Sequence, residues 1–350
     1  PSSALAPELT GDYDQRSSFL SFRAFFGWTG GNAMTVMTFA LIFPAFVTAT
    51  IPNGQFNRDA YEVYGIIGGA LMVTAILISS IGTHSRIPHL KSPPPKRNLT
   101  IRAIFGEMAE TLGNRSFGAL FIAALFGAIA SGLAAALSFY FLTYFWGFTS
   151  GQSSLITIGV FGSAIIGALM APIVTKTLGK KKGAIIIGLI AFLGAPFPVV
   201  LRLFGLLNDG SDPFTFWFVF ITTLIDVGLI ICFQILTGSM MSDLVEQSEV
   251  KTGRRSEGLF ISASTFIRKV VAGIGVITAT MILTLAGIQA GADPSQVSDR
   301  SVWLLGAWYV PIILSLWLSM VAVIAFYNID RASHEANLQT LADRKEAAGG

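Results

Sequence analysis

The sequence has few charged residues and only one cysteine. Asp, Glu, Lys and Arg make up 12% of its 350 residues, whereas an ordinary soluble domain carries roughly 25%. So few charges cannot cover a soluble surface, which excludes an ordinary soluble protein. The single cysteine, Cys232, cannot form an internal disulfide. The net charge of +3 is too small, and the basic residues too scattered, to indicate nucleic-acid binding.

Residue patterns for catalysis or metal binding are also missing. His84 and His89 lie in one polar segment without other metal-ligand residues beside them, so we expect no metal site. The sequence shows no nucleophile–base arrangement and no glycine loop that would bind phosphate. We therefore expect a protein that is not an enzyme and has no cofactor.

Long apolar runs are abundant, since 53% of the residues are hydrophobic. About 20 consecutive apolar residues span a bilayer as a helix. The pattern predicts an all-α membrane protein with eight transmembrane helices in this chain. The predicted spans are 19–49, 61–82, 117–147, 153–175, 184–207, 213–240, 258–287 and 303–327.

The distribution of Lys and Arg predicts the orientation of these spans. An even number of crossings puts both chain ends on one side of the membrane. Loops on that side hold 17 Lys and Arg residues, and the opposite loops hold 3. Positive charge collects on the cytoplasmic side of membrane proteins. Both ends of this chain are therefore expected in the cytoplasm.

A long polar segment, 83–116, divides the chain. It contains Pro93, Pro94 and Pro95 and then an amphipathic pattern typical of a linker helix. Two spans precede it and six follow, as in the second half of a twelve-span transporter built from two six-helix bundles. The predicted organisation is a partial first bundle at 1–82, a linker at 83–116, a second bundle at 117–327 and a cytoplasmic tail at 328–350. This count implies about four further spans upstream, and the opening on Pro1 without an initiator Met leads us to expect a fragment.

Three segments resemble a known family. Residues 172–182, PIVTKTLGKKK, resemble the basic gating loop of major facilitator transporters. Residues 242–258, SDLVEQSEVKTGRRSEG, resemble the cytoplasmic signature of the glycoside–pentoside–hexuronide:cation symporters, the melibiose permease family. Residues 1–16 resemble the end of that family's helix 4 and the loop after it. The resemblance implies a major facilitator fold, here helices 5–12 with the end of helix 4.

This resemblance also implies a function. It implies a monomeric transporter in the bacterial inner membrane that moves a small polar solute, a glycoside or related sugar, together with sodium, lithium or a proton. A carrier of lysolipid or another amphiphile with the same fold is an alternative, as is a membrane receptor or scaffold that transports nothing. The family's cation-binding carboxylates lie on helices 2 and 4, so we expect the cation's ligands outside this chain.

Charged residues inside predicted spans are candidate functional residues, because a charge at mid-bilayer costs about 2.5–3.5 kcal/mol. Lys269 lies roughly 17 Å into the seventh span, near the depth of transporter sites. Asp226 lies near the centre of the sixth span. We expect it to balance Lys269 or the adjacent Arg268, and a carboxylate that carries a proton is the alternative. Arg23, one turn into the first span, either reaches back to the cytoplasmic surface or contacts solute.

The resemblance assigns roles to some of these residues. It implies that Lys269 couples solute and cation binding and that Arg23 contacts the solute. Two departures from the family put a galactoside in question: Ser3 and Gln234 stand where the melibiose permease has tryptophans. Gln234 can still donate and accept hydrogen bonds with a polar solute.

Charged residues on the cytoplasmic side form a candidate gate. We expect a network of charges in the loop after the sixth span, facing the basic loop after the fourth, to close the cytoplasmic side. Weak pairs in a solvated loop are the alternative. The predicted gate residues are Asp243, Glu246, Glu249, Arg254, Arg255 and Lys180.

Overall fold

The computed structural model describes residues 26, 30–51, 53–85, 115–252, 257–289, 291–328, 339, 340 and 343. Within these residues every regular element is a helix. Seven helices are long and apolar enough to cross a membrane, and a shorter apolar helix spans Gly30–Ala45. The predicted all-α membrane fold is therefore confirmed. The amphipathic linker helix and most of the tail lie outside the described residues.

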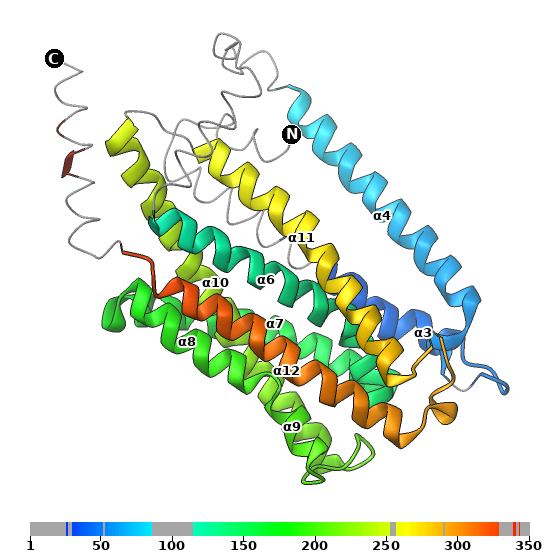
Figure 1. Cartoon of the computed structure of the whole chain (residues 1–350). Helices are drawn as coiled ribbons and strands as arrows, with labels where there is room; N and C mark the ends of the chain where they lie inside the picture. Colours follow the sequence, from blue (N-terminus) through cyan, green and yellow to red (C-terminus); the bar gives the residue numbers. More distant parts are fainter. Residues whose placement is uncertain are drawn as a thin grey trace. The chain divides into compact units, whose positions relative to one another are not determined.

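The described chain divides into two compact units. One consists of residues 1–100 and 149–161, and the other of residues 101–148 and 162–350. Helix α7 (Ser150–Leu178) contributes its first residues to the first unit and the remainder to the second. Figure 1 shows the helices in sequence colours.

The first unit has a small aromatic core beneath a long helix, α4 (Arg58–His84). The short helix at Gly30–Ala45 contains a π-helical turn at Thr38–Ile42 and ends in α3 (Phe43–Ala45). Phe39, Ile42 and Phe43 pack with Ala60 of α4. Asn57 caps α4 through the Asp59 amide and donates its Nδ2 to the Phe46 carbonyl at 2.9 Å. This cap fixes where α4 begins.

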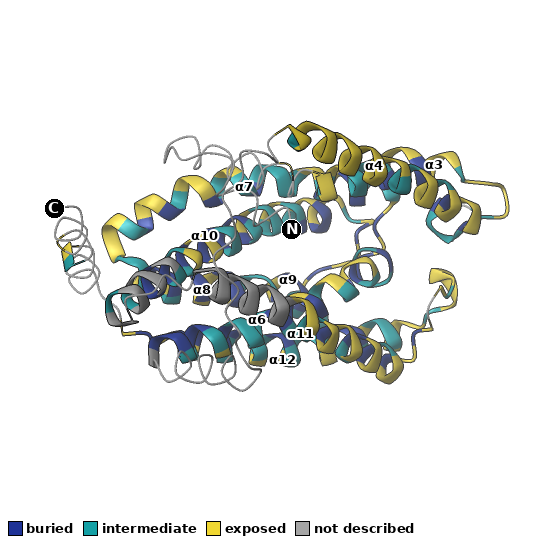
Figure 2. Cartoon of the chain, turned by 90° about the horizontal axis from the view of Figure 1, so that it is seen from above, coloured by how far each residue is buried: buried dark blue, intermediate teal, exposed yellow. Residues whose placement is uncertain are grey.

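Most of α4 is exposed within the chain, as its yellow colour in Figure 2 shows. Apolar side chains such as Ile66, Met72 and Ile81 are 64–73% exposed. In a membrane protein such side chains face lipid or further helices, because burying them from water is favourable in either setting.

The second unit is a bundle in which helices pack side by side (Figure 1). Helix α11 packs on α6, α10 packs on α8, and α12 packs on α6, α8 and α11. The helices are α6 (Arg115–Tyr140), α8 (Lys180–Gly194), α9 (Phe197–Leu203), α10 (Pro213–Thr252), α11 (Glu257–Ala286) and α12 (Asp299–Ile324). A π-helical turn at Phe141–Phe145 extends α6.

Glycines allow two of these helix pairs to approach closely. A Cβ at Gly132 of α6 would collide with the Ala272 carbonyl, and one at Gly275 of α11 would collide with the Ile129 carbonyl. Helices α7 and α10 also approach closely, because a Cβ at Gly167 would collide with the Gly228 carbonyl, and Ser163 Oγ donates to the Leu224 carbonyl at 2.8 Å. In lipid no hydrophobic force drives helices together, so their association depends on close packing. Small residues permit that packing because they let the backbones approach.

Two predictions about element boundaries need correction. The predicted fifth span, 184–207, is present as the apolar segment Lys180–Leu203, but it is divided into two helices, α8 and α9, because Pro196 and Pro198 supply no amide hydrogen for a continuous helix. The segment after the sixth span, predicted as a loop, is helical to Thr252 within α10. No glycine or proline stands between Gly238 and Gly253, so nothing in the sequence ends the helix earlier.

Candidate functional site

Several predicted site residues fall where the structure gives no side-chain description. Arg23, Arg254 and Arg255 lie outside the described residues. Glu246 and Glu249 lie on α10, and Arg268 lies on α11, but the structure describes only their backbones. The roles of these six residues stay predictions.

Lys269 lies near the middle of α11. It is 12 residues after Glu257 and 17 residues before Ala286, or about 18 Å and 26 Å from the helix ends at 1.5 Å per residue. Its side chain is exposed within the chain. Gln234 on α10 is exposed as well. The structure therefore leaves both polar side chains open to contact, while their binding roles stay predictions.

Asp226 on α10 is buried, with 8% of its surface exposed. Its Oδ1 atom has no hydrogen-bond partner. The carboxyl lies against Gly194 at the end of α8, where an added Cβ would stand 3.1 Å from Oδ1. Asp226 and Lys269 form no ion pair among the residues that the structure describes. The predicted balance between Asp226 and Arg268 stays a prediction.

Lys180 and Asp243 join the start of α8 to the C-terminal part of α10. The Lys180 ammonium donates to both carboxylate oxygens of Asp243, at 2.6 Å and 2.9 Å. The Asp243 side chain is 6% exposed and that of Lys180 is 26% exposed. Contact with both oxygens and the burial of Asp243 make this pair more than a weak surface contact.

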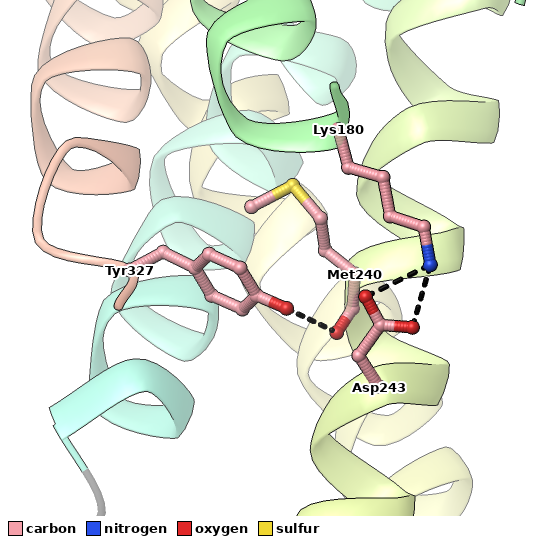
Figure 3. A network of polar contacts seen from close by, with 4 residues as sticks. All are labelled: Lys180, Met240, Asp243 and Tyr327. Atoms are coloured by element: carbon pink, nitrogen blue, oxygen red, sulfur yellow. Dashed lines mark hydrogen bonds and ion pairs between the residues drawn. The ribbon is translucent and has the colours of Figure 1, made fainter. Parts of the chain in front are cut away.

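Tyr327 lies beside this pair, just past the end of α12. Its hydroxyl donates to the Met240 carbonyl at 3.3 Å (Figure 3). Tyr327 is 1% exposed and Met240 is fully buried. We refer to Lys180, Met240, Asp243 and Tyr327 as the Lys180 cluster. It joins α8, α10 and the chain that follows α12.

Sequence reasoning predicted half of this cluster. Lys180 and Asp243 were recognised because they lie in charged segments that resemble the family's gate. Tyr327 and Met240 were missed, because a tyrosine at the end of an apolar run carries no signal for the carbonyl it will contact. A neighbouring contact, in which the Asn328 amide donates to Ser116 Oγ at 3.0 Å, was also missed.

The opposite end of the second unit is closed by aromatic side chains. The Arg202 guanidinium on α9 lies 4.8 Å from the centre of the Phe145 ring and 5.6 Å from that of Trp146. Trp146 stacks on Phe148, and Phe148 meets the edge of Phe216 on α10. These contacts join the end of α6 to α9 and α10.

The loop between α9 and α10 is held by carboxylates. The amide and hydroxyl of Ser211 donate to Asp209. These hydrogen bonds, assisted by the charge of Arg202, lower the pKa of the Asp209 carboxyl below its ordinary value. In the described part of the chain, no three His, Cys, Asp or Glu residues are grouped where they would hold a metal ion.

Comparison with known proteins gives a consistent result. The profile of the family described as MFS/sugar transport protein matches residues 1–331. An uncharacterized symporter of Synechocystis sp. is 24% identical over 288 residues, which cover 81% of this chain and 50% of that protein. A lactose permease of Lactobacillus delbrueckii subsp. bulgaricus is 23% identical over 321 residues, covering 89% and 47%.

A third relative is similar over a greater share of its length. The isoprimeverose transporter of Lactiplantibacillus pentosus is 22% identical over 345 residues, which cover 95% of this chain and 64% of that protein. The chain thus spans about half the length of the first two relatives.

Proposed function

Since the chain belongs to the MFS/sugar transport protein family, we propose that the whole protein is a secondary active transporter. It carries a glycoside or related sugar across the membrane together with a cation, by alternating access. The observation that carries this proposal is the match of the family profile to residues 1–331. The named relatives, which include a symporter, a permease and a sugar transporter, support the class of solute.

Lys269, Gln234 and Arg23 are the proposed solute contacts. Lys269 supports the assignment because it is a cation near the middle of α11 whose side chain is exposed within the chain. A charge at that depth is costly and marks a functional position by default. Its ammonium can donate three hydrogen bonds to sugar hydroxyls, and Arg23 offers planar paired donors. Gln234 on α10 is exposed as well and can both donate and accept.

The Lys180 cluster supports a cytoplasmic gate. In this proposal Lys180 and Asp243 close that side together with Glu246, Glu249, Arg254 and Arg255. The pair of Lys180 and Asp243 is short and partly buried, so separating the two groups requires energy. Such a pair favours one state of the transporter until solute binding favours another.

The remaining assignments follow from the sequence and the family. The coupling cation is proposed to be sodium, lithium or a proton. Both ends of the chain are proposed to lie in the cytoplasm of a bacterial cell, with the protein a monomer in the inner membrane. The excess of Lys and Arg on one side supports this orientation.

Counterflow in liposomes tests the function with the full-length protein. The panel consists of labelled glycosides, pentosides, hexuronates and lysolipids, each with and without sodium and at two pH values. We expect cation-stimulated exchange of one sugar class, with loss of that exchange in Lys269→Ala. Ile277→Ala is the control, because Ile277 is an exposed side chain of the same helix, 62% exposed.

Other outcomes would reject the proposal. Exchange of lysolipid alone would identify an amphiphile carrier of the same fold. Binding of a sugar without exchange would identify a receptor. Exchange that is unchanged in Lys269→Ala would remove Lys269 from the solute site and leave the transporter class intact.

A further inference from the structure

The break between α8 and α9 leaves polar backbone groups inside a membrane span. The span Lys180–Leu203 is apolar throughout, yet α8 ends at Gly194 and α9 begins at Phe197. Pro196 and Pro198 have no amide hydrogen, so the carbonyls of Phe192 and Gly194 receive no hydrogen bond from the residue four positions on. Backbone groups at such depth need a partner.

The end of α8 also carries partial negative charge. The carbonyls of the last turn of α8 point toward the break, and the positive end of α9, which begins at Phe197, offsets part of the negative end of the α8 dipole. Interrupted membrane helices use such C-terminal ends and freed carbonyls to hold coupling ions. The break thus has the character of one side of a cation site.

Asp226 supplies the other side. It lies 13 residues after Pro213 and 15 residues before Met241, at the middle of the apolar part of α10. Its side chain is 8% exposed, its Oδ1 has no hydrogen-bond partner, and the carboxyl lies against Gly194. The Asp226 carboxyl therefore lies beside the break in an apolar interior, where a carboxylate without a cation is costly.

No cation of the protein balances this charge among the described residues. On α8, Lys180, Lys181 and Lys182 lie at the opposite end of the helix from Gly194. On α9, Arg202 lies over aromatic rings. On α7, Lys176 lies in the last turn.

Helices α6 and α12 bring no closer cation among the residues whose side chains the structure describes. On α6, no ionisable residue lies between Arg115 and Tyr140. On α12, Tyr309 is close enough to interact electrostatically with Asp226, but its phenol carries no positive charge, and Arg300 lies at the start of that helix. Asp226 takes part in no ion pair among the described residues.

We propose that Asp226 and the end of α8 form a second binding site for the coupling cation, within this chain. One carboxylate balances one positive charge, so the site fits a monovalent cation, sodium or a proton. A proton would turn the carboxyl into a donor to a freed carbonyl, and sodium would be held by carboxylate and carbonyl oxygens. The inference rests on the proposed cation-coupled transport, and it adds a site to the one expected on the upstream helices.

Cation binding without sugar tests the site independently of transport. The full-length protein in detergent is titrated with radioactive sodium, and the number of ions bound per protein is counted. Asp226→Asn keeps the shape of the side chain and removes its charge. If sodium occupies the site, this variant binds one sodium fewer than the wild type. Asp293→Asn is the control, because Asp293 lies in an exposed turn outside the membrane spans.

A proton at the site is detected by infrared spectroscopy. A difference spectrum between high and low pH, without sodium, reports the carbonyl stretch of a protonated carboxylic acid. If a proton occupies the site, the wild type and Asp293→Asn show a band that Asp226→Asn lacks. The two measurements together separate sodium from a proton.

Gly194→Ala provides a variant that keeps the carboxylate. The added methyl group would stand 3.1 Å from Asp226 Oδ1, so the carboxyl must move. We expect the half-saturating sodium concentration to rise, or the protonated-acid band to shift. This variant tests the site even if Asp226→Asn fails to fold.

The inference is overturned if Asp226→Asn folds, binds as many sodium ions as the wild type and shows the same infrared bands. It is also overturned if Gly194→Ala changes neither measurement. The proposed function fails separately. If the wild type binds a cation that Asp226→Asn does not bind, but the wild type exchanges no sugar, the site is kept and sugar transport is rejected. If Asp226→Asn exchanges sugar with the same cation dependence as the wild type, sugar transport is kept and the site at Asp226 is rejected.

Discussion

The surroundings of each buried charged residue decide its effect on stability and binding. Asp243 is 4% exposed, and its carboxylate accepts two hydrogen bonds from Lys180. Asp226 is buried to a similar degree but has no cation beside it among the described residues. Two aspartates on the same helix therefore differ, because one has a fixed ammonium and the other faces the end of a broken helix.

Lys180→Ala should destabilise the second unit. It removes the ammonium and leaves Asp243 buried without it, which costs about 1.5–3 kcal/mol for a hydrogen bond to a charged group. Thermal unfolding of the full-length protein in detergent measures this loss as a lower midpoint. Lys182→Ala is the matched control, because Lys182 is exposed and a surface charge contributes little. Equal midpoints for the two variants would contradict the role of the ion pair.

The swapped pair Lys180→Asp with Asp243→Lys checks the same interaction in reverse. It should recover part of the stability that either single change removes, since opposite charges face each other again. A double variant as unstable as the sum of the single variants would show that the two residues act independently.

The stability of the loop between α9 and α10 should depend on pH through Asp209. Its pKa is lowered in the folded protein, chiefly by hydrogen bonds from Ser211. The stability that the Asp209 carboxylate contributes to the folded loop is therefore complete above the ordinary pKa of about 3.9. It is lost as the pH falls through the lower pKa of the folded protein. Hydrogen exchange of the Ser211 amide should accelerate over that range, relative to its intrinsic rate. The acceleration should be missing in Asp209→Asn, and its persistence there would contradict the assignment.

At the scale of elements, the close crossing of α6 and α11 depends on two glycines that face backbone. Gly132 and Gly275 lie where a Cβ would collide with carbonyl or amide atoms of the other helix. Backbone cannot move as a flexible side chain can, so the helices must separate to admit a methyl group. The glycine content of these spans therefore serves packing at particular positions.

Gly275→Ala should lower the free energy of unfolding by about 1–3 kcal/mol, as overpacking does. Gly273→Ala, two residues away, has nothing within 4 Å of its added Cβ and should be neutral or slightly stabilising, because alanine favours a helix over glycine. Thermal unfolding of both variants in detergent separates the two effects. A Gly275→Ala protein as stable as Gly273→Ala would show that the crossing is looser than the structure indicates.

At the scale of the whole molecule, the proposed orientation in the membrane rests on the distribution of Lys and Arg. The test uses sealed right-side-out vesicles and a variant without cysteines, from which Cys232 is also removed. In this background Lys182→Cys should react with a membrane-impermeant maleimide only after the vesicles are permeabilised. Asp209→Cys should react from outside at once. Lys182 lies in the first turn of α8 and Asp209 lies after α9, at opposite ends of the span Lys180–Leu203. Labelling in the reverse order would invert the proposed topology.

The sequence alone determined where most membrane helices lie and which family the chain belongs to. Apolar length is a local property, so spans such as 153–175 and 303–327 were predicted within a few residues of α7 and α12. Residues 172–182 and 242–258 supported a resemblance that the family match over residues 1–331 confirms. The mid-helix position of Lys269 was also readable, since it depends only on counting residues along α11.

The local sequence pattern predicted less well where a helix breaks or extends beyond its apolar part. Pro196 and Pro198 were visible in the sequence, but an apolar run continues through them, so the span was predicted as one helix. Residues 241–252 are polar and were predicted as a loop, although nothing in them ends a helix. Their helix is joined to α8 through Asp243 and Lys180, a contact between residues 63 positions apart.

Only the tertiary structure decided which side chains meet. Membrane helices are apolar on every side, so hydrophobic periodicity does not mark the face that packs. Nothing in the sequence placed Tyr327 at the Met240 carbonyl, or the carboxyl of Asp226 at Gly194. These contacts depend on how α8, α10 and α12 cross, and that crossing is set by small residues and polar partners distributed over the whole bundle.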